Sequence, residues 1–200
     1  MKLVTSSNLE GFYYKPRVDK ELLEQHGEGL VVLSGCPSSE LSRLLRDGDM
    51  DGATRAARWY KERFPDFYLE FQRHGNLPFL DQLNEGLLRL RSEFDIPLVA
   101  TNDLHYVNSE DAPYQDVMVC IQTNTNVNDG KRLKMADDSY YLKSPQEMAA
   151  LFADLPEAID NTERIAEMCQ VTLDFSTLHL PQFPTPASER PDDYLARLCW

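Results

Sequence analysis

The 200-residue sequence predicts an α/β fold built around a parallel sheet. Short apolar runs without alternation recur along the chain, which is typical of strands buried on both faces. Each run is followed by a segment with apolar residues at helical spacing, and the strand–helix units have similar lengths. This periodicity does not distinguish a barrel from an open sheet. No glycine-rich phosphate loop follows a strand, which weakens a nucleotide-binding interpretation.

Four short strands are expected. The first lies in residues 29–36, where four apolar residues run between glycines. The second covers residues 67–72 and is rich in aromatic residues, which favour strands. The third covers residues 97–102 and the fourth residues 140–142.

Helices are expected between and after these strands, and their ends are marked by capping residues and prolines. The clearest start is Ser144-Pro145-Gln146-Glu147, a capping box with proline at the first helical position. The other expected helices lie near residues 19–27, from Pro37 through Leu45, through Ala53 and Tyr60 to before Pro65, over residues 80–90, and from Ser109, Pro156 and Asp192.

Composition limits the classes of function. The chain has 20 basic and 33 acidic residues, a net charge of −13, which argues against a free-standing nucleic-acid coat. Residues 144–200 hold three basic and ten acidic residues, so we expect this region to face solvent or protein and the isolated chain to bind DNA weakly or not at all. No apolar run approaches the roughly 20 residues of a membrane helix, and no secretory signal is evident.

The cysteines and the prolines indicate the compartment and the domain organisation. The four cysteines are far apart and form no CxxC, which favours reduced thiols in a cytoplasmic protein. Cys120, Cys169 and Cys199 are expected to pack on helical faces. Four prolines between 181 and 191 predict an extended linker. We therefore expect a domain over residues 1–178, followed by a linker and the start of another region over residues 179–200.

Functional residues in parallel α/β folds gather where strands end, and three strand ends carry suitable groups. Cys36 follows the first strand, where it could be a soft metal ligand or a small buried hydrophobic residue. Asp103 and His105 follow the third strand and point the same way in extended geometry. Such a pair could be half of a divalent metal site, or the carboxylate could simply orient the imidazole.

The end of the second strand carries Glu70, Gln72 and His74, which share one strand face by parity. The favoured interpretation of His74 is a surface histidine, with the carboxylate paired to arginine. His26 and His179 have no acidic or thiol neighbours at ligand spacing and are interpreted as structural.

Five segments recur in a familiar order: residues 11–17 (GFYYKPR), 34–36 (SGC), 67–75 (FYLEFQRHG), 101–106 (TNDLHY) and 144–148 (SPQEM). Over about residues 3–186, the chain resembles the PHP (polymerase and histidinol phosphatase) domain of bacterial replicative DNA polymerase III alpha subunits. The resemblance implies a distorted seven-stranded β/α barrel with divalent metals at the carboxyl end of its strands. It places Cys36, Asp103 and His105 among the metal ligands. Glu70, His74 and Asn102 are candidates for side chains that support these ligands.

The sequence also departs from the family pattern. The family's cluster begins with an H-x-H pair, and none exists here, so an incomplete barrel and an incomplete metal site are expected. The polymerase palm is also absent, which makes the chain look like a piece of a larger protein. A cysteine ligand favours zinc, although manganese or magnesium would also suit such a site.

Two functions follow from the resemblance. One is a metal-dependent phosphoesterase that acts as a 3′–5′ exonuclease. The other is a non-catalytic scaffold that stabilises the polymerase and docks a proofreading exonuclease subunit. In both cases the expected partners are the rest of the alpha subunit, with DNA contacted only through that larger protein and no membrane involved.

Overall fold

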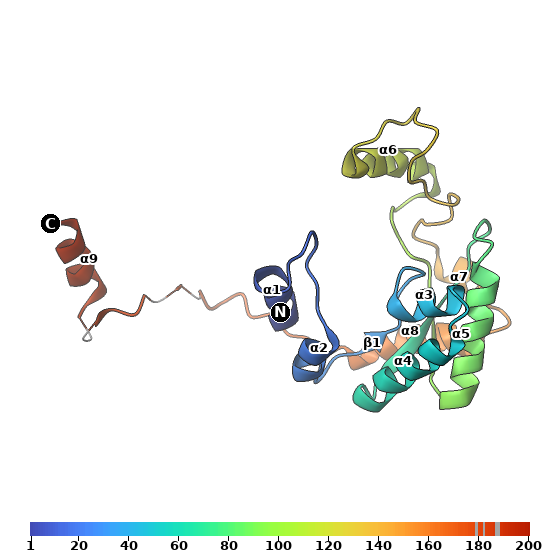
Figure 1. Ribbon diagram of the computed structural model, residues 1–200, viewed down its shortest axis with the longest axis horizontal. Coiled ribbons are helices and arrows are strands. Elements are labelled where there is room, and N and C mark those ends of the chain that lie inside the picture. Colours follow the sequence, from blue (N-terminus) through green and yellow to red (C-terminus); the bar gives the residue numbers. More distant parts are fainter. Residues whose placement is uncertain (179, 182, 187–188) are drawn as a thin grey trace. The chain divides into compact units, whose positions relative to one another are not determined.

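The computed structural model describes residues 1–178, 180–181, 183–186 and 189–200 of the chain. It divides into two units, residues 1–168 and residues 169–200. The first unit contains eight α-helices and three strands among these residues (Figure 1). In chain order they are α1 (Lys2–Leu9), α2 (Lys20–His26), β1 (Val32–Leu33), α3 (Glu40–Arg46), α4 (Met50–Arg63), β2 (Phe67–Gln72), α5 (Leu80–Phe94), β3 (Leu98–Thr101), the 3-10 turn η1 (Ser109–Asp111), α6 (Ala112–Thr123), α7 (Pro145–Leu151) and α8 (Pro156–Met168).

The strands form a parallel sheet in the order β1-β2-β3. Val32 pairs with Phe67, and the second pairing runs from Leu69 opposite Leu98 to Gln72 opposite Thr101. The predicted α/β class with a parallel sheet is therefore confirmed. In the described part of the chain the sheet has three strands and is not closed, so the predicted barrel is not formed by these residues alone.

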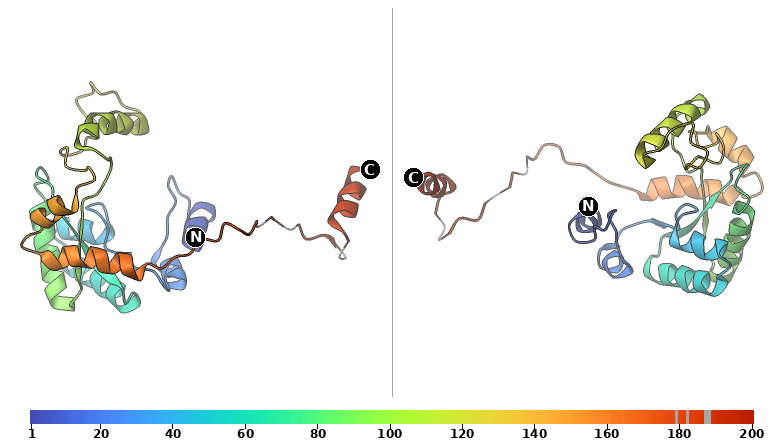
Figure 2. Two further views of the ribbon diagram at one scale, coloured as in Figure 1. Left: turned by 180° about the vertical axis from the view of Figure 1, so that it is seen from behind. Right: turned by 45° about the horizontal axis from the view of Figure 1, so that its top comes forward.

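The two faces of the sheet differ in their surroundings because side chains alternate along a strand. Phe67, Leu69 and Phe71 of β2 point to one face and pack with apolar residues of α3, α4, α5, α7 and α8 in the main core. Figure 2 shows α8 beside the sheet and α6 standing away from it. The opposite face of β2 carries Tyr68, Glu70 and Gln72, so the polar side chains of this strand lie on the face away from the main core.

Most expected helices are confirmed, and their ends follow the capping residues. Ser144 and Glu147 form the predicted capping box at the start of α7. α8 is anchored on β3 because the buried Asn161 amide donates a hydrogen bond to the Leu98 carbonyl (2.7 Å). α1 was not expected. Its apolar residues Val4 and Leu9 are exposed, so this helix has no buried apolar stripe of the kind that a sequence pattern indicates.

Two expectations were wrong in detail. Residues 140–142 do not form a strand; Tyr141 makes only an isolated parallel bridge with Tyr106. Cys120 is buried as expected, but Cys169 and Cys199 are exposed. Cys169 lies just beyond the end of α8, where its helix no longer packs it against the core.

The second unit contains α9 (Pro191–Cys199), which begins close to the predicted Asp192. The described residues between 180 and 190 contain no strand or α-helix. His179 lies outside the described residues.

Candidate functional site

The carboxyl ends of the three strands are joined by a polar network on the face opposite the main core. The Glu70 backbone N–H of β2 donates to Ser34 Oγ, just after β1 (2.8 Å). Glu70 Oε1 accepts hydrogen bonds from Thr101 Oγ1 of β3 (2.7 Å) and from Gln72 Nε2 (2.8 Å). Glu70 therefore holds neighbouring strand ends together, and it is not paired with an arginine as the sequence suggested.

The sequence placed Gln72 on the same strand face as Glu70, but neither Gln72 nor Thr101 was predicted as a site residue. Gln72 is almost completely buried, and its Oε1 has no hydrogen-bond partner among the described residues. A buried acceptor without a partner costs free energy, so a hydrogen-bond donor placed against Gln72 Oε1 would be stabilising.

His74 lies at the end of β2 and is half-buried, so its interpretation as a surface histidine was wrong. Its ring stacks on the Tyr140 ring (4.2 Å between centroids, 16°), and Nδ1 lies 2.7 Å from Ser139 Oγ. Because the Ser139 hydroxyl donates a hydrogen bond to Asp137, we assign Nδ1–H of His74 as the donor to Ser139 Oγ. His74 Nε2 is then an acceptor, and it is buried without a partner in the described structure.

Asp103 and His105 lie in the irregular loop that follows β3. Asp103 has a positive φ of 46°, an uncommon backbone conformation for a residue with a side chain. His105 Nδ1 is 2.6 Å from the Asp103 backbone carbonyl, so Nδ1 is the donor, and in the neutral ring Nε2 is the nitrogen that presents a lone pair. The Asp103 carboxylate is not the group that orients the imidazole, which was one of the two alternatives.

Tyr140 contacts both His74 and His105. Its ring meets the His105 ring edge-on (5.7 Å, 86°) while it stacks on His74, and its backbone carbonyl accepts the His105 N–H (2.9 Å). Burial, followed by the negative charges of Asp137 and Asp103, raises the pKa of Tyr140 to about 12. Burial lowers the pKa of His74, although the same two carboxylates oppose the shift, so His74 favours the neutral form.

Cys36 is a partly buried free thiol after β1, and its backbone carbonyl accepts the N–H of Ser39 (2.9 Å). The sheet order places β2 between the strand before Cys36 and the strand before Asp103, a separation of about 10 Å between those two strands. Across the described ranges, no three or more histidine, cysteine, aspartate and glutamate side chains gather in a group that could hold a metal. The residues present do not complete a metal site, and the ligand roles of Cys36, Asp103 and His105 stay predictions.

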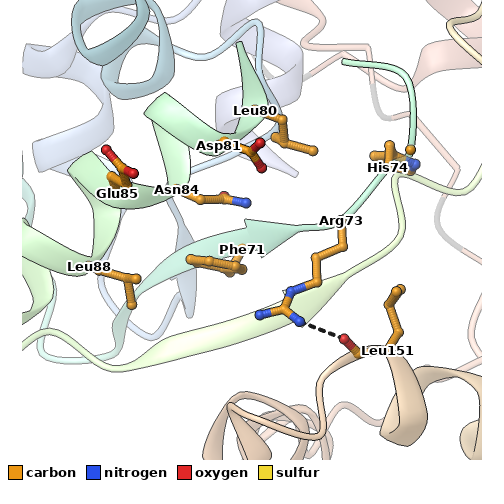
Figure 3. Close-up of a pocket in the computed structure, with 10 residues that line it drawn as sticks. Phe71, Arg73, His74, Leu80, Asp81, Asn84, Glu85, Leu88 and Leu151 are labelled. Atoms are coloured by element: carbon orange, nitrogen blue, oxygen red, sulfur yellow. Dashed lines mark hydrogen bonds between the residues drawn. The ribbon is translucent and has the colours of Figure 1, made fainter. Parts of the chain in front are cut away.

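A groove of about 610 Å³, lined in part by His74, lies between the end of β2, α5 and the end of α7 (Figure 3). Arg73 crosses it, donates to the Leu151 carbonyl (2.8 Å) and pairs with Asp154 (2.7 Å). Its guanidinium also lies over the Phe152 ring. Arg73 is thus occupied in joining β2 to the α7–α8 junction, and the groove offers no free cation from this residue.

The fold and these strand ends define a class: an α/β domain that collects carboxylate, imidazole and hydroxyl groups at the carboxyl edge of a parallel sheet. Residues 1–74 match the family model described as PHP domain. Cys36, Glu70 and His74 lie inside this match, and Asp103 and His105 lie beyond it.

The chain is also similar to larger proteins over nearly its whole length. It is 46% identical over 188 residues to the DNA polymerase III subunit alpha of Borreliella burgdorferi, 93% of this chain and 16% of that protein. The corresponding subunit of Treponema pallidum is 43% identical over 188 residues, again 93% and 16%. That of Thermus aquaticus is 38% identical over 208 residues, 99% of this chain and 17% of that protein.

These matches confirm the resemblance predicted from the sequence: the chain is similar to the PHP region of bacterial DNA polymerase III alpha subunits. It spans about a sixth of the length of the curated relatives it matches. No helix in the described ranges is long and apolar enough to cross a membrane.

Proposed function

We propose that this chain is part of the PHP domain of a replicative DNA polymerase III alpha subunit and acts within that subunit in DNA replication. The observation that carries the proposal is the 38–46% identity to subunits of that name over at least nine-tenths of the chain. The three-stranded sheet would be one section of a seven-stranded β/α barrel, and residues 179–200 would lead into the next region of the subunit. A replicative polymerase acts on the chromosome, so the proposed location is the cytoplasm.

Within the whole subunit, Cys36, Asp103 and His105 would contribute ligands to a divalent metal site, and other segments of the subunit would supply the rest. This is supported by the tautomer of His105, whose Nδ1–H bond to a backbone carbonyl leaves Nε2 free for a ligand. A thiolate ligand favours zinc, and the carboxylate would also suit manganese or magnesium. A complete site of this kind would serve a phosphoesterase or a 3′–5′ exonuclease.

The alternative is a scaffold that stabilises the polymerase and docks a proofreading exonuclease subunit. One observation favours it: the described residues gather no group of three ligands, and a divalent ion on Asp103 and His105 alone would be weakly held. The two functions differ in whether the intact subunit contains metal.

The test is the metal content of the intact subunit that contains this sequence, measured by mass spectrometry after extensive dialysis. Asp103→Ala and His105→Ala should each lower the bound metal by about one equivalent, whereas His26→Ala, a histidine on α2 away from the strand ends, should not. Unchanged stoichiometry in both variants would overturn the ligand assignment. A wild-type subunit without bound zinc, manganese or magnesium would support the scaffold.

A further inference from the structure

The loop after β3 holds Asp103 in the left-handed backbone region, which is uncommon for a residue with a side chain. Asp103 has φ of 46°, and a residue with a side chain keeps this sparsely populated conformation only where the surrounding structure imposes it. The contacts that could impose it come from residues 139–143, the segment that follows α6 in the chain and precedes α7. They attach to the residues on both sides of Asp103.

On one side, Asn102 Nδ2 donates to the backbone carbonyls of Ser139 (2.9 Å) and Tyr141 (2.8 Å). On the other side, the His105 N–H donates to the Tyr140 carbonyl (2.9 Å). The Leu142 N–H then donates to the Tyr106 carbonyl (3.2 Å). Hydrogen bonds with residues 139–142 therefore hold the loop both before and after Asp103.

Lys143 completes this arrangement. Its Nζ donates to Asn102 Oδ1 (3.0 Å) and to the Ser139 carbonyl, and it lies 4.3 Å from the centre of the Tyr141 ring. An amide can face two carbonyls with Nδ2 only if Oδ1 points the other way, and a cation there satisfies Oδ1 and fixes that orientation. Removing the cation would leave Oδ1 without this donor.

We propose that Lys143 is a positioning residue, which acts through the Asn102 amide to hold the Asp103–His105 loop. This rests on the proposed function only in that Asp103 and His105 are the side chains it positions. The contacts define a clamp of Asn102 and Lys143 on the 139–141 backbone. The clamp presents the Asp103 carboxylate and His105 Nε2 in one fixed arrangement.

The test compares Lys143→Met with Lys131→Met in the full chain without added metal. Both variants remove one positive charge and keep the aliphatic stem, but Lys131 is exposed in the loop after α6. Amide hydrogen exchange at His105 and Leu142 should become about tenfold faster or more in Lys143→Met, because a charge-assisted hydrogen bond is lost. It should stay unchanged in Lys131→Met. The ¹⁵N shifts of the His105 ring should also show a smaller fraction protonated at Nδ1 in Lys143→Met.

Leu69 of β2, whose N–H donates to the Pro97 carbonyl, serves as the internal control. Equal acceleration at Leu69 and His105 would show global destabilisation and overturn the local role, as would unchanged exchange at His105. Asn102→Ala and the double variant complete the test: if Lys143 acts through Asn102, their effects on His105 exchange are not additive, and additive effects overturn the proposal. These rates decide the clamp independently of the metal content of the intact subunit.

Discussion

The positive φ of Asp103 predicts a reversal of the usual preference between alanine and glycine. At an ordinary helical position such as Glu85, which is exposed in the middle of α5, glycine is less stable than alanine by about 1 kcal/mol. At Asp103 the left-handed conformation costs alanine roughly 1–2 kcal/mol and costs glycine nothing. Glycine still loses about 0.5–1 kcal/mol through its more flexible unfolded chain. Asp103→Gly should therefore be more stable than Asp103→Ala by about 0.5–1 kcal/mol.

Urea denaturation of both pairs of variants, with the slope checked for constancy, measures these differences. The expected sign is opposite at the two positions, and each kcal/mol should move the melting temperature by roughly 2–4 °C for a chain of this size. If Asp103→Gly is less stable than Asp103→Ala, the loop is not strained in the way described, and the clamp would have nothing to hold. If the expected order is found, the left-handed conformation at residue 103 carries the cost described, and the surrounding contacts are what maintain it.

Two further predictions concern the packing and the pH dependence of the domain. Phe152 is completely buried between α7 and the sheet, so Phe152→Ala should lower the free energy of unfolding by about 3–5 kcal/mol, whereas Phe175→Ala, at an 89% exposed residue, should change it by less than about 0.5 kcal/mol in the same denaturation assay. Hydrogen bonds from Tyr141 and from the cap of α7 lower the pKa of Glu147 to about 2. Its stabilising effect should be complete above the ordinary pKa of about 4.5 and be lost as the pH falls from there towards 2, because the unfolded state then binds the proton more tightly. Between pH 2.5 and 6, the free energy of unfolding should fall less steeply with decreasing pH in Glu147→Gln than in the wild type. A Glu147→Gln profile that matches the wild type, together with a flatter profile for Glu163→Gln, would contradict this assignment.

The capping residues and the apolar runs were sufficient to predict the three strands and the described helices other than α1. Ser144 and Glu147 act through hydrogen bonds within one helical turn, so the start of α7 is a local property. The fourth expected strand failed for the opposite reason. Tyr140 and Tyr141 have strand propensity, but a strand also needs a neighbour, and among the described residues only Tyr106 pairs there.

The candidate site, too, could be predicted only in part from the sequence. By itself, the sequence determined that polar side chains would stand at the ends of β1, β2 and β3, because parity along a strand and the resemblance to PHP domains are both readable from the order of residues. Only the tertiary structure decided which of them meet: Glu70 with Thr101, His74 with Ser139 and Tyr140, and Asn102 with Lys143. Lys143 is 41 residues away from Asn102 in the chain, and a pairing across such a distance depends on how the intervening segment folds back. Local hydrogen bonding acts over a few residues and is written in the sequence, whereas contacts between distant segments depend on the packing of the whole domain.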